Sequence, residues 1–151
     1  MSKFIYRMQN VLNIKNKLEA QAKQEYSAAR AALNEEEDKL ERLYKRKADY
    51  EEEARTLMSS KLDVHKINEN NAAIMTMQNF IALQQDEVRR AELMLERARQ
   101  KLEEVMKERK AQEILRDNAF EQFLQEEKAQ ESKEIDELVS YQYGQKIQVN
   151  D

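Results

Sequence analysis

The residues of this chain that could do chemistry are paired carboxylates and one histidine. Glu126 precedes Glu127, Asp136 precedes Glu137, and His65 is the only histidine. Paired carboxylates can serve as general acid and base, but that role needs a pocket that shifts a pKa and excludes water. In a chain with 37% charged residues, adjacent acids are expected to be solvated surface groups.

Other groups used in catalysis or cofactor binding are missing. The sequence has no cysteine, which excludes a thiolate nucleophile, a disulfide and a thiolate metal site. A single glycine is too few for a glycine-rich phosphate loop. His65, with neither a cysteine nor a second histidine, is expected to be a loop residue. We therefore expect no enzyme activity, catalytic residue, cofactor or metal, and place function in surfaces that bind other proteins.

A hydrophobic repeat between residues 67 and 105 predicts a long helix. Alternate steps of three and four residues meet an apolar side chain at ten of twelve positions. These positions are Ile67, Asn70, Ile74, Met77, Ile81, Gln84, Val88, Ala91, Leu95, Ala98, Leu102 and Val105. A narrow apolar stripe with this spacing is the seam of a coiled coil, which is buried against another helix.

The partner helix lies upstream in the same chain. A second series of the same spacing runs from Ile5 to Leu57 and is apolar at twelve of sixteen places. Folding the chain back between the two series sets Leu57 against Ile67, and the opposing residues then fit as large against small near the far end. The predicted fold is all-α, an antiparallel intramolecular coiled-coil hairpin.

The predicted organisation is a single coiled-coil rod over residues 1–151. Helix 1 is expected at about 3–58, with Ser2 as a possible N-cap, a turn at about 59–66, and helix 2 at about 67–140. Gly144 is expected to mark the end of the helix, followed by a loose C-terminal tail. Since helix 2 is longer than helix 1, its C-terminal end is expected to overhang the N-terminus.

The seam is imperfect near the end that carries both termini. Lys15 and Glu19 fall on it, beside an apolar row of Phe4, Val11 and Leu18. The favoured interpretation is a local shift of the stripe by one position, and the second is a widened binding surface. Beyond Val105 the seam meets polar residues, while a row with a four-residue spacing predicts a drift of the stripe. The polar residues are Arg109, Gln112 and Arg116, and the row is Ala111, Leu115, Ala119 and Phe123.

The charge is unevenly distributed although the net charge is only −4. Residues 1–31 hold six bases and two acids, whereas residues 120–137 hold seven acids and two bases. Both segments fall at the open end of the predicted hairpin. No dense Lys/Arg face with interleaved aromatics appears, so nucleic acid is not an expected partner. No apolar run approaches the ~20 residues of a membrane span, so no membrane insertion is expected.

Side chains off the seam are the candidates for partner binding, because exposed aromatics and polarised charge can anchor another protein. Isolated surface apolar residues are also common, and a broadened core is an equally simple explanation for each. The candidate partner-binding residues are Phe4, Arg7, Val11, Lys15, Lys17, Tyr44, Phe80, Leu83, Phe120, Asp136 and Glu137.

Two segments resemble the flagellar export protein FliJ family. The N-terminal run KFIYRMQNVLNIKNKLEAQAKQEYSAARAAL matches in Phe4, Arg7, Val11 and Leu12, followed by an Ala-rich helix. KLEEVMKERKAQEIL and FEQFLQEEKAQESKEIDEL resemble the second helix of the family. Glu131, Lys133, Asp136 and Glu137 fall in its acidic closing motif. The resemblance covers essentially the whole chain.

This resemblance implies a stalk or adaptor protein of the flagellar type III export apparatus. It implies binding to the hexameric export ATPase FliI, promotion of its ring assembly, and contacts with the export gate protein FlhA and export chaperones. It also implies a cytoplasmic protein, peripheral to the cytoplasmic face of the cell membrane at the flagellar base. By the same analogy the open end enters the ATPase ring and the middle of the hairpin meets the gate or the chaperones.

The alternative is a structural coiled coil that self-associates into a dimer or filament and has no ATPase partner. The stalk protein and the structural coiled coil differ in their expected oligomeric state. A self-contained hairpin is expected to be a monomer of 18.0 kDa in isolation, whereas a filament protein is at least dimeric.

Overall fold

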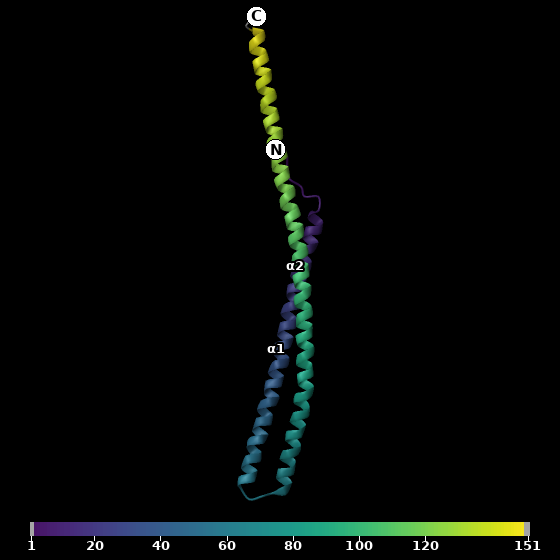
Figure 1. Cartoon of the computed structure of the whole chain (residues 1–151), viewed down its shortest axis with the longest axis vertical. Coiled ribbons are helices and arrows are strands. Elements are labelled where there is room, and N and C mark those ends of the chain that lie inside the picture. The colour runs from purple at the N-terminus through teal and green to yellow at the C-terminus, as the bar shows by residue number, and fades with distance from the viewer. Residues whose placement is uncertain (1, 150–151) are drawn as a thin grey trace. The chain divides into compact units, whose positions relative to one another are not determined.

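The chain folds into two long helices joined by a short loop. The structure, a computed structural model, describes residues 2–149, with side chains through residue 147. Helix α1 spans Gln9–Ser59 and helix α2 spans Val64–Val149. No strand occurs among the described residues. The predicted all-α fold is therefore confirmed, and Figure 1 shows α1 and α2 on the two sides of the loop that joins them.

Contacts divide the chain into two compact units. Unit 1 contains residues 1–19 and 105–151, and unit 2 contains residues 20–104. Each unit holds part of α1 and part of α2. The expectation of a single continuous rod stays a prediction.

Side-chain hydrogen bonds lie at both helix ends that flank the loop. The Ser59 hydroxyl donates a hydrogen bond of 3.0 Å to the Thr56 carbonyl at the end of α1. Asp63 precedes α2, and its carboxylate accepts from the backbone N–H groups of His65 and Lys66 at 3.1 and 3.3 Å. This is the usual N-cap arrangement of an aspartate.

Unit 2 is the closed part of the hairpin, and its core is the predicted seam. Every seam position of α2 from Ile67 to Leu102 is buried or half-buried, as is every seam position of α1 from Ala22 to Leu57. The two helices are antiparallel, as two contacts between them show. The Asn70 amide donates to the Tyr50 carbonyl at 2.9 Å, and Lys101 lies 2.9 Å from Glu25. Both pairs lie within about one helical turn of the predicted register.

From Leu12 to Glu19 unit 1 keeps the same seam, and the predicted shift of the stripe is wrong there. Leu12 and Glu19 are buried and Lys15 is half-buried, whereas Leu18 of the flanking row is 40% exposed. On α2 the inward positions include Arg109 and Gln112. Ion pairs and hydrogen bonds stabilise these polar residues at seam positions. No shift of the stripe is therefore needed to remove them from the interface between the helices.

The predicted drift of the α2 stripe is confirmed only in its last part, where the half-buried residues Ala119, Phe123 and Glu127 recur every four residues and Arg116 on the seam is exposed. Ala111 and Leu115 are exposed, and only Ala119 and Phe123 of that row are half-buried. The inward positions follow the alternating steps of three and four from Val105 through Arg109 and Gln112.

The helix boundaries differ from the prediction at two places. Helix α1 begins at Gln9 rather than near residue 3, and the Ser2 hydroxyl donates to Glu127 instead of capping α1. Helix α2 continues through Gly144 to Val149, so residues 145–149 are helical rather than a loose tail. Gly144 does not adopt a positive φ, and Gln145 donates to the Tyr141 hydroxyl at 2.9 Å across it. Residues 150–151 of the predicted tail lie outside the described residues.

The C-terminal part of α2 has no packing partner among the described residues. All side chains from Lys128 to Ile147 are exposed, which agrees with the predicted overhang beyond the N-terminus. The exposed apolar side chains of this segment are Ile135, Leu138, Val139, Tyr141, Tyr143 and Ile147.

Candidate functional site

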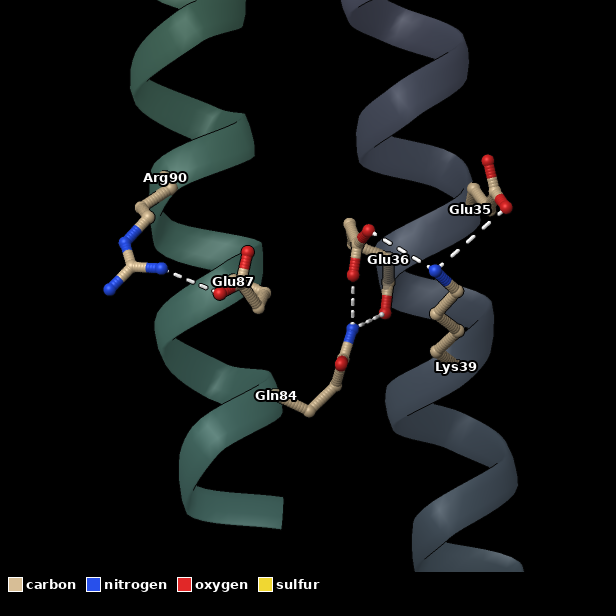
Figure 2. Close-up of polar contacts among 6 residues, drawn as sticks. All are labelled: Glu35, Glu36, Lys39, Gln84, Glu87 and Arg90. Atoms are coloured by element: carbon tan, nitrogen blue, oxygen red, sulfur yellow. Dashed lines mark hydrogen bonds and ion pairs between the residues drawn. The ribbon is translucent and has the colours of Figure 1, made fainter. Parts of the chain in front are cut away.

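A polar layer interrupts the apolar seam of unit 2. Gln84 of α2 reaches across to α1 and donates from its amide to the Glu36 backbone carbonyl at 3.0 Å and to its carboxylate at 2.5 Å (Figure 2). Lys39 lies 3.4 Å from the same carboxylate. The hydrogen bond from Gln84, aided by Lys39, lowers the pKa of Glu36 below its ordinary value. A charged Glu36 is therefore compatible with its position on the seam.

A shallow groove lies on one flank of this layer. Its floor is formed by Leu43 and Gln84, and Phe80 and Leu83 stand beside them, 48% and 65% exposed. The α2 side of the groove is completed by Asp86, Glu87 and Arg90, and an adjoining hollow on α1 is lined by Lys39, Arg42 and Arg46. Glu87 and Arg90 pair with each other at 2.6 Å (Figure 2). The α1 rim is therefore basic and the α2 rim carries both signs.

Tyr44 lies on the opposite flank from Phe80 and Leu83. Phe80 and Leu83 directly precede seam positions of α2, whereas Tyr44 directly follows one of α1. In an antiparallel pair, residues that follow seam positions face residues that follow them on the other helix. The Tyr44 hydroxyl accordingly accepts from Gln85, which follows Gln84, at 2.8 Å. The structure brings Phe80 and Leu83 together and leaves Tyr44 outside their groove.

Unit 1 carries a layer of ion pairs on its seam. The Glu19 carboxylate contacts the Nε of Arg109, and the side chains are 10% and 18% exposed. Arg109 also lies 2.6 Å from Glu113, and Lys15 lies 2.8 Å from Glu108. The hydrogen bond to Glu113 raises the pKa of Arg109, and the hydrogen bond to Glu19 adds a smaller effect in the same direction. Lys15, a predicted partner-binding residue, is thus held between the two helices.

An aromatic cluster lies beyond this layer. The Phe4 ring centroid is 5.1 Å from that of Phe120, edge to face, and 5.4 Å from that of Phe123. Phe4 is half-buried and Phe120 is 44% exposed. The predicted candidates Phe4 and Phe120 are thus in contact, and Val11 is half-buried on the same unit.

The charged candidates are exposed. Arg7 and Lys17 are exposed in the N-terminal part of unit 1, and Asp136 and Glu137 are exposed on the overhanging part of α2. None of the contacts described here links the two bases with the two acids. Their roles in binding stay predictions.

Several residues of these surfaces were absent from the sequence-based candidates. Arg42, Arg46 and Leu43 complete the groove beside Phe80, and Phe123 completes the aromatic cluster. The positions of Arg42 and Arg46 relative to the seam could have identified them from the sequence. Each stands one place before a seam position of α1, as Phe80 and Leu83 do on α2, and such flanks meet in an antiparallel pair.

Taken together, the fold and these surfaces define a class: an antiparallel two-helix coiled-coil protein whose exposed features suit binding to other proteins. Its seam alternates apolar layers with polar ones, and shallow grooves lie beside it.

The chain belongs to the flagellar FliJ protein family. The family model, described as the flagellar FliJ protein, matches residues 3–148, which is nearly the whole chain. The resemblance found in the terminal motifs is thereby confirmed. Membership makes the chain a protein of the flagellar type III export system.

A solved structure is similar along nearly its whole length. It is described as that of a candidate YscO homologue, CT670 from Chlamydia trachomatis. The TM-score is 0.64 at 21% sequence identity, and the match covers 97% of this chain and 99% of the other. At this identity the likeness concerns the fold. A comparison with curated proteins gives no match.

Two further findings concern membranes and metals. Within residues 2–149, neither helix offers a stretch long and apolar enough to cross a membrane. The same part of the chain holds no group of three or more acidic, histidine or cysteine side chains arranged to bind a metal ion.

Proposed function

We propose that this protein is a non-enzymatic adaptor of flagellar type III export that binds the hexameric export ATPase through unit 1. It promotes assembly of the ATPase ring and couples the ring to the export gate and to export chaperones. The protein acts in the cytoplasm, peripheral to the membrane at the flagellar base. In isolation it is a monomer, because both helices of the coiled coil come from one chain.

The observation that carries the proposal is the unpartnered end of α2 in unit 1. From Lys128 to Ile147 the helix packs against no described segment, yet Ile135, Leu138 and Val139 share one face at helical spacing. An apolar stripe left in solvent over this length supports contact with another protein. Family membership supports an ATPase ring as that protein.

The exposed charges of unit 1 also support this unit as the surface that binds the ATPase. Arg7 and Lys17 are exposed in the N-terminal part of unit 1, and Asp136 and Glu137 are exposed on the overhang. A ring of repeated subunits offers repeated charged surfaces, and complementary charge raises the rate of encounter and fixes orientation.

The groove beside Phe80 and Leu83 is the proposed surface for the export gate or a chaperone. Two half-exposed apolar side chains over a floor of Leu43 suit an anchor of an amphipathic helix. The basic rim of Lys39, Arg42 and Arg46 favours a partner with acidic residues along one edge.

The test is the rate of ATP hydrolysis by a purified flagellar export ATPase with and without this protein. Wild-type protein is expected to raise the rate. Lys17→Glu in unit 1 is expected to weaken the stimulation, whereas Lys61→Glu, an exposed lysine of the loop in unit 2, is expected to leave it unchanged. No stimulation by the wild type, or equal effects of the two variants, contradicts the proposed ATPase contact.

The self-associating coiled coil remains the second candidate. Sedimentation at low concentration separates the two, because the adaptor is expected to sediment as a monomer of 18.0 kDa. A dimer or filament under these conditions favours the structural protein.

A further inference from the structure

Residues 2–8 form a non-helical strap on α2, with residues 2–6 irregular and residues 7–8 in a turn that leads into α1, although nothing in their sequence opposes a helix. Helix α1 begins only at Gln9. The segment SKFIYRM contains neither proline nor glycine, the two residues that strongly disfavour helix. Adding turns to an existing helix also avoids the unfavourable nucleation step. Tertiary contacts must therefore hold the strap in its extended form.

Three contacts hold the strap along α2. The Ser2 hydroxyl lies 2.6 Å from Glu127, the Phe4 ring lies against Phe120 and Phe123, and the Tyr6 hydroxyl donates to Gln112 at 3.4 Å. From Gln112 to Glu127, α2 advances roughly 22 Å. Four residues in a helix advance only about 6 Å, whereas an extended chain covers up to about 14 Å and long side chains supply the rest. The observed contacts require the extended form.

The strap leaves two seam residues largely exposed to solvent. Ile5 and Met8 continue the seam of α1 in phase with Leu12, but they are 80% and 45% exposed. In a helix that continued α1 toward the N-terminus, both would lie on the buried side. Ile5 would then stand opposite Ala119 in the register of the hairpin. The strap and the helix therefore bury different residues of the same segment: Phe4 in one, Ile5 and Met8 in the other.

We propose that residues 2–8 switch between two states, the strap seen here and a two-turn N-terminal extension of α1. The strap covers Phe120 and Phe123 of α2. The helical state withdraws the contacts of Ser2 and Tyr6 and frees that face. Because a partner bound to this part of unit 1 competes with the strap, partner binding favours the helical state. The role of the switch in partner binding rests on the proposed function.

The two states are separated by substitutions with opposite effects. Phe4→Ala removes the anchor of the strap, so amide hydrogen exchange at residues 6–8, whose N–H groups would gain acceptors within the helix, is expected to become slower than in the wild type as the helix extends. Ile5→Ser added to Phe4→Ala is expected to restore fast exchange, because it removes the main seam contact of the helix. Ile14→Ser, a 55% exposed isoleucine of unit 1, is the matched control and is expected to have no effect.

The proposal is overturned if the N-terminal segment of the Phe4→Ala variant frays instead of forming a helix. If Phe4→Ala leaves exchange at residues 6–8 as fast as in the wild type or faster, the segment has no helical alternative. This measurement needs no partner and decides the inference by itself.

A second measurement connects the switch to function. Ile5→Ser alone is expected to reduce stimulation of the export ATPase, while Ile14→Ser retains it. Equal stimulation by both variants overturns the link between switch and partner. If the wild type gives no stimulation, the proposed function fails instead, and the exchange measurement still stands.

Discussion

Glu19 and Arg109 face each other across the helix pair of unit 1, with only 10% and 18% of their side chains exposed. Both occupy positions that apolar residues hold elsewhere along the seam. Glu113 and the neighbouring Lys15–Glu108 pair extend the layer. An ion pair largely removed from water contributes little net stability, but it opposes registers that leave either charge unpaired. We therefore expect this layer to fix the register of unit 1.

Replacing one partner of this pair is expected to destabilise the protein more than replacing both. Glu19→Leu leaves Arg109 with one carboxylate fewer at a mostly buried place, which lowers the free energy of unfolding. Adding Arg109→Leu is expected to recover much of the loss, since two leucines pack on the seam. Urea unfolding followed by circular dichroism measures both effects. The exposed pair Glu41–Lys45 is the control, with single substitutions changing stability by about 0.5 kcal/mol or less. Additive losses in the Glu19 and Arg109 cycle would count against the layer.

The Glu36 layer predicts a dependence of stability on pH. The hydrogen bond from Gln84 makes the pKa of Glu36 lower in the folded state than in the unfolded one. Its stabilising contribution is therefore fully present above the unfolded pKa and is lost as the pH falls through the folded pKa. The stability difference between the wild type and Glu36→Gln is expected to shrink as the pH is lowered from 7 toward 3. Urea unfolding across this range measures it, and a constant difference would refute the linkage.

Phe80 and Ile81 are neighbours in sequence with different expected roles. Ile81 is 7% exposed on the seam, so Ile81→Ala is expected to lower the free energy of unfolding by about 2–5 kcal/mol. Phe80 is 48% exposed beside the groove, so Phe80→Ala is expected to cost about 1 kcal/mol or less. Thermal unfolding measures the first effect. Binding of gate or chaperone fragments measures the second, and Phe80→Ala with full binding would argue against the groove.

The Phe4–Phe120 contact is expected to be energetically coupled. An edge-to-face aromatic pair contributes about 0.5–1.5 kcal/mol beyond burial of its area. A double-mutant cycle with Phe4→Leu and Phe120→Leu should therefore show a coupling of this size in unfolding free energy. Leucine keeps most of the apolar volume, which isolates the ring geometry. Because the strap can open, a coupling near zero would mean that the contact is rarely formed in solution.

Asp63 is expected to stabilise the start of α2. Its carboxylate accepts two backbone N–H groups that have no partner within the helix. Asp63→Ala is expected to lower the free energy of unfolding by about 0.5–2 kcal/mol. Ser60→Ala, at an exposed residue of the same loop, serves as the comparison in chemical denaturation and is expected to have little effect.

The sequence alone determined the hairpin, because a seam can be counted along the chain. Spacing of three and four residues identified the buried positions of unit 2, including Asn70 and Gln84, which are polar and nonetheless inward. The terminal motifs pointed to the family that the comparison confirms. The cap at Asp63 is also local, because its carboxylate and the N–H groups that it binds lie within three residues of one another.

Only the tertiary structure decided what happens at the polar and terminal positions. Spacing puts Glu19 and Arg109 on the seam, but whether the stripe moves away from them depends on a partner about 90 residues distant in the chain. The start of α1 at Gln9 depends on the contact of Phe4 with Phe120 and Phe123. The helix propensity of residues 2–8 alone would continue the helix toward the N-terminus. The separate flanks of Tyr44 and Phe80, by contrast, follow from the sequence, because Tyr44 comes directly after a seam position and Phe80 directly before one. Local periodicity fixes which residues turn inward, and contacts between distant segments fix what each of them meets.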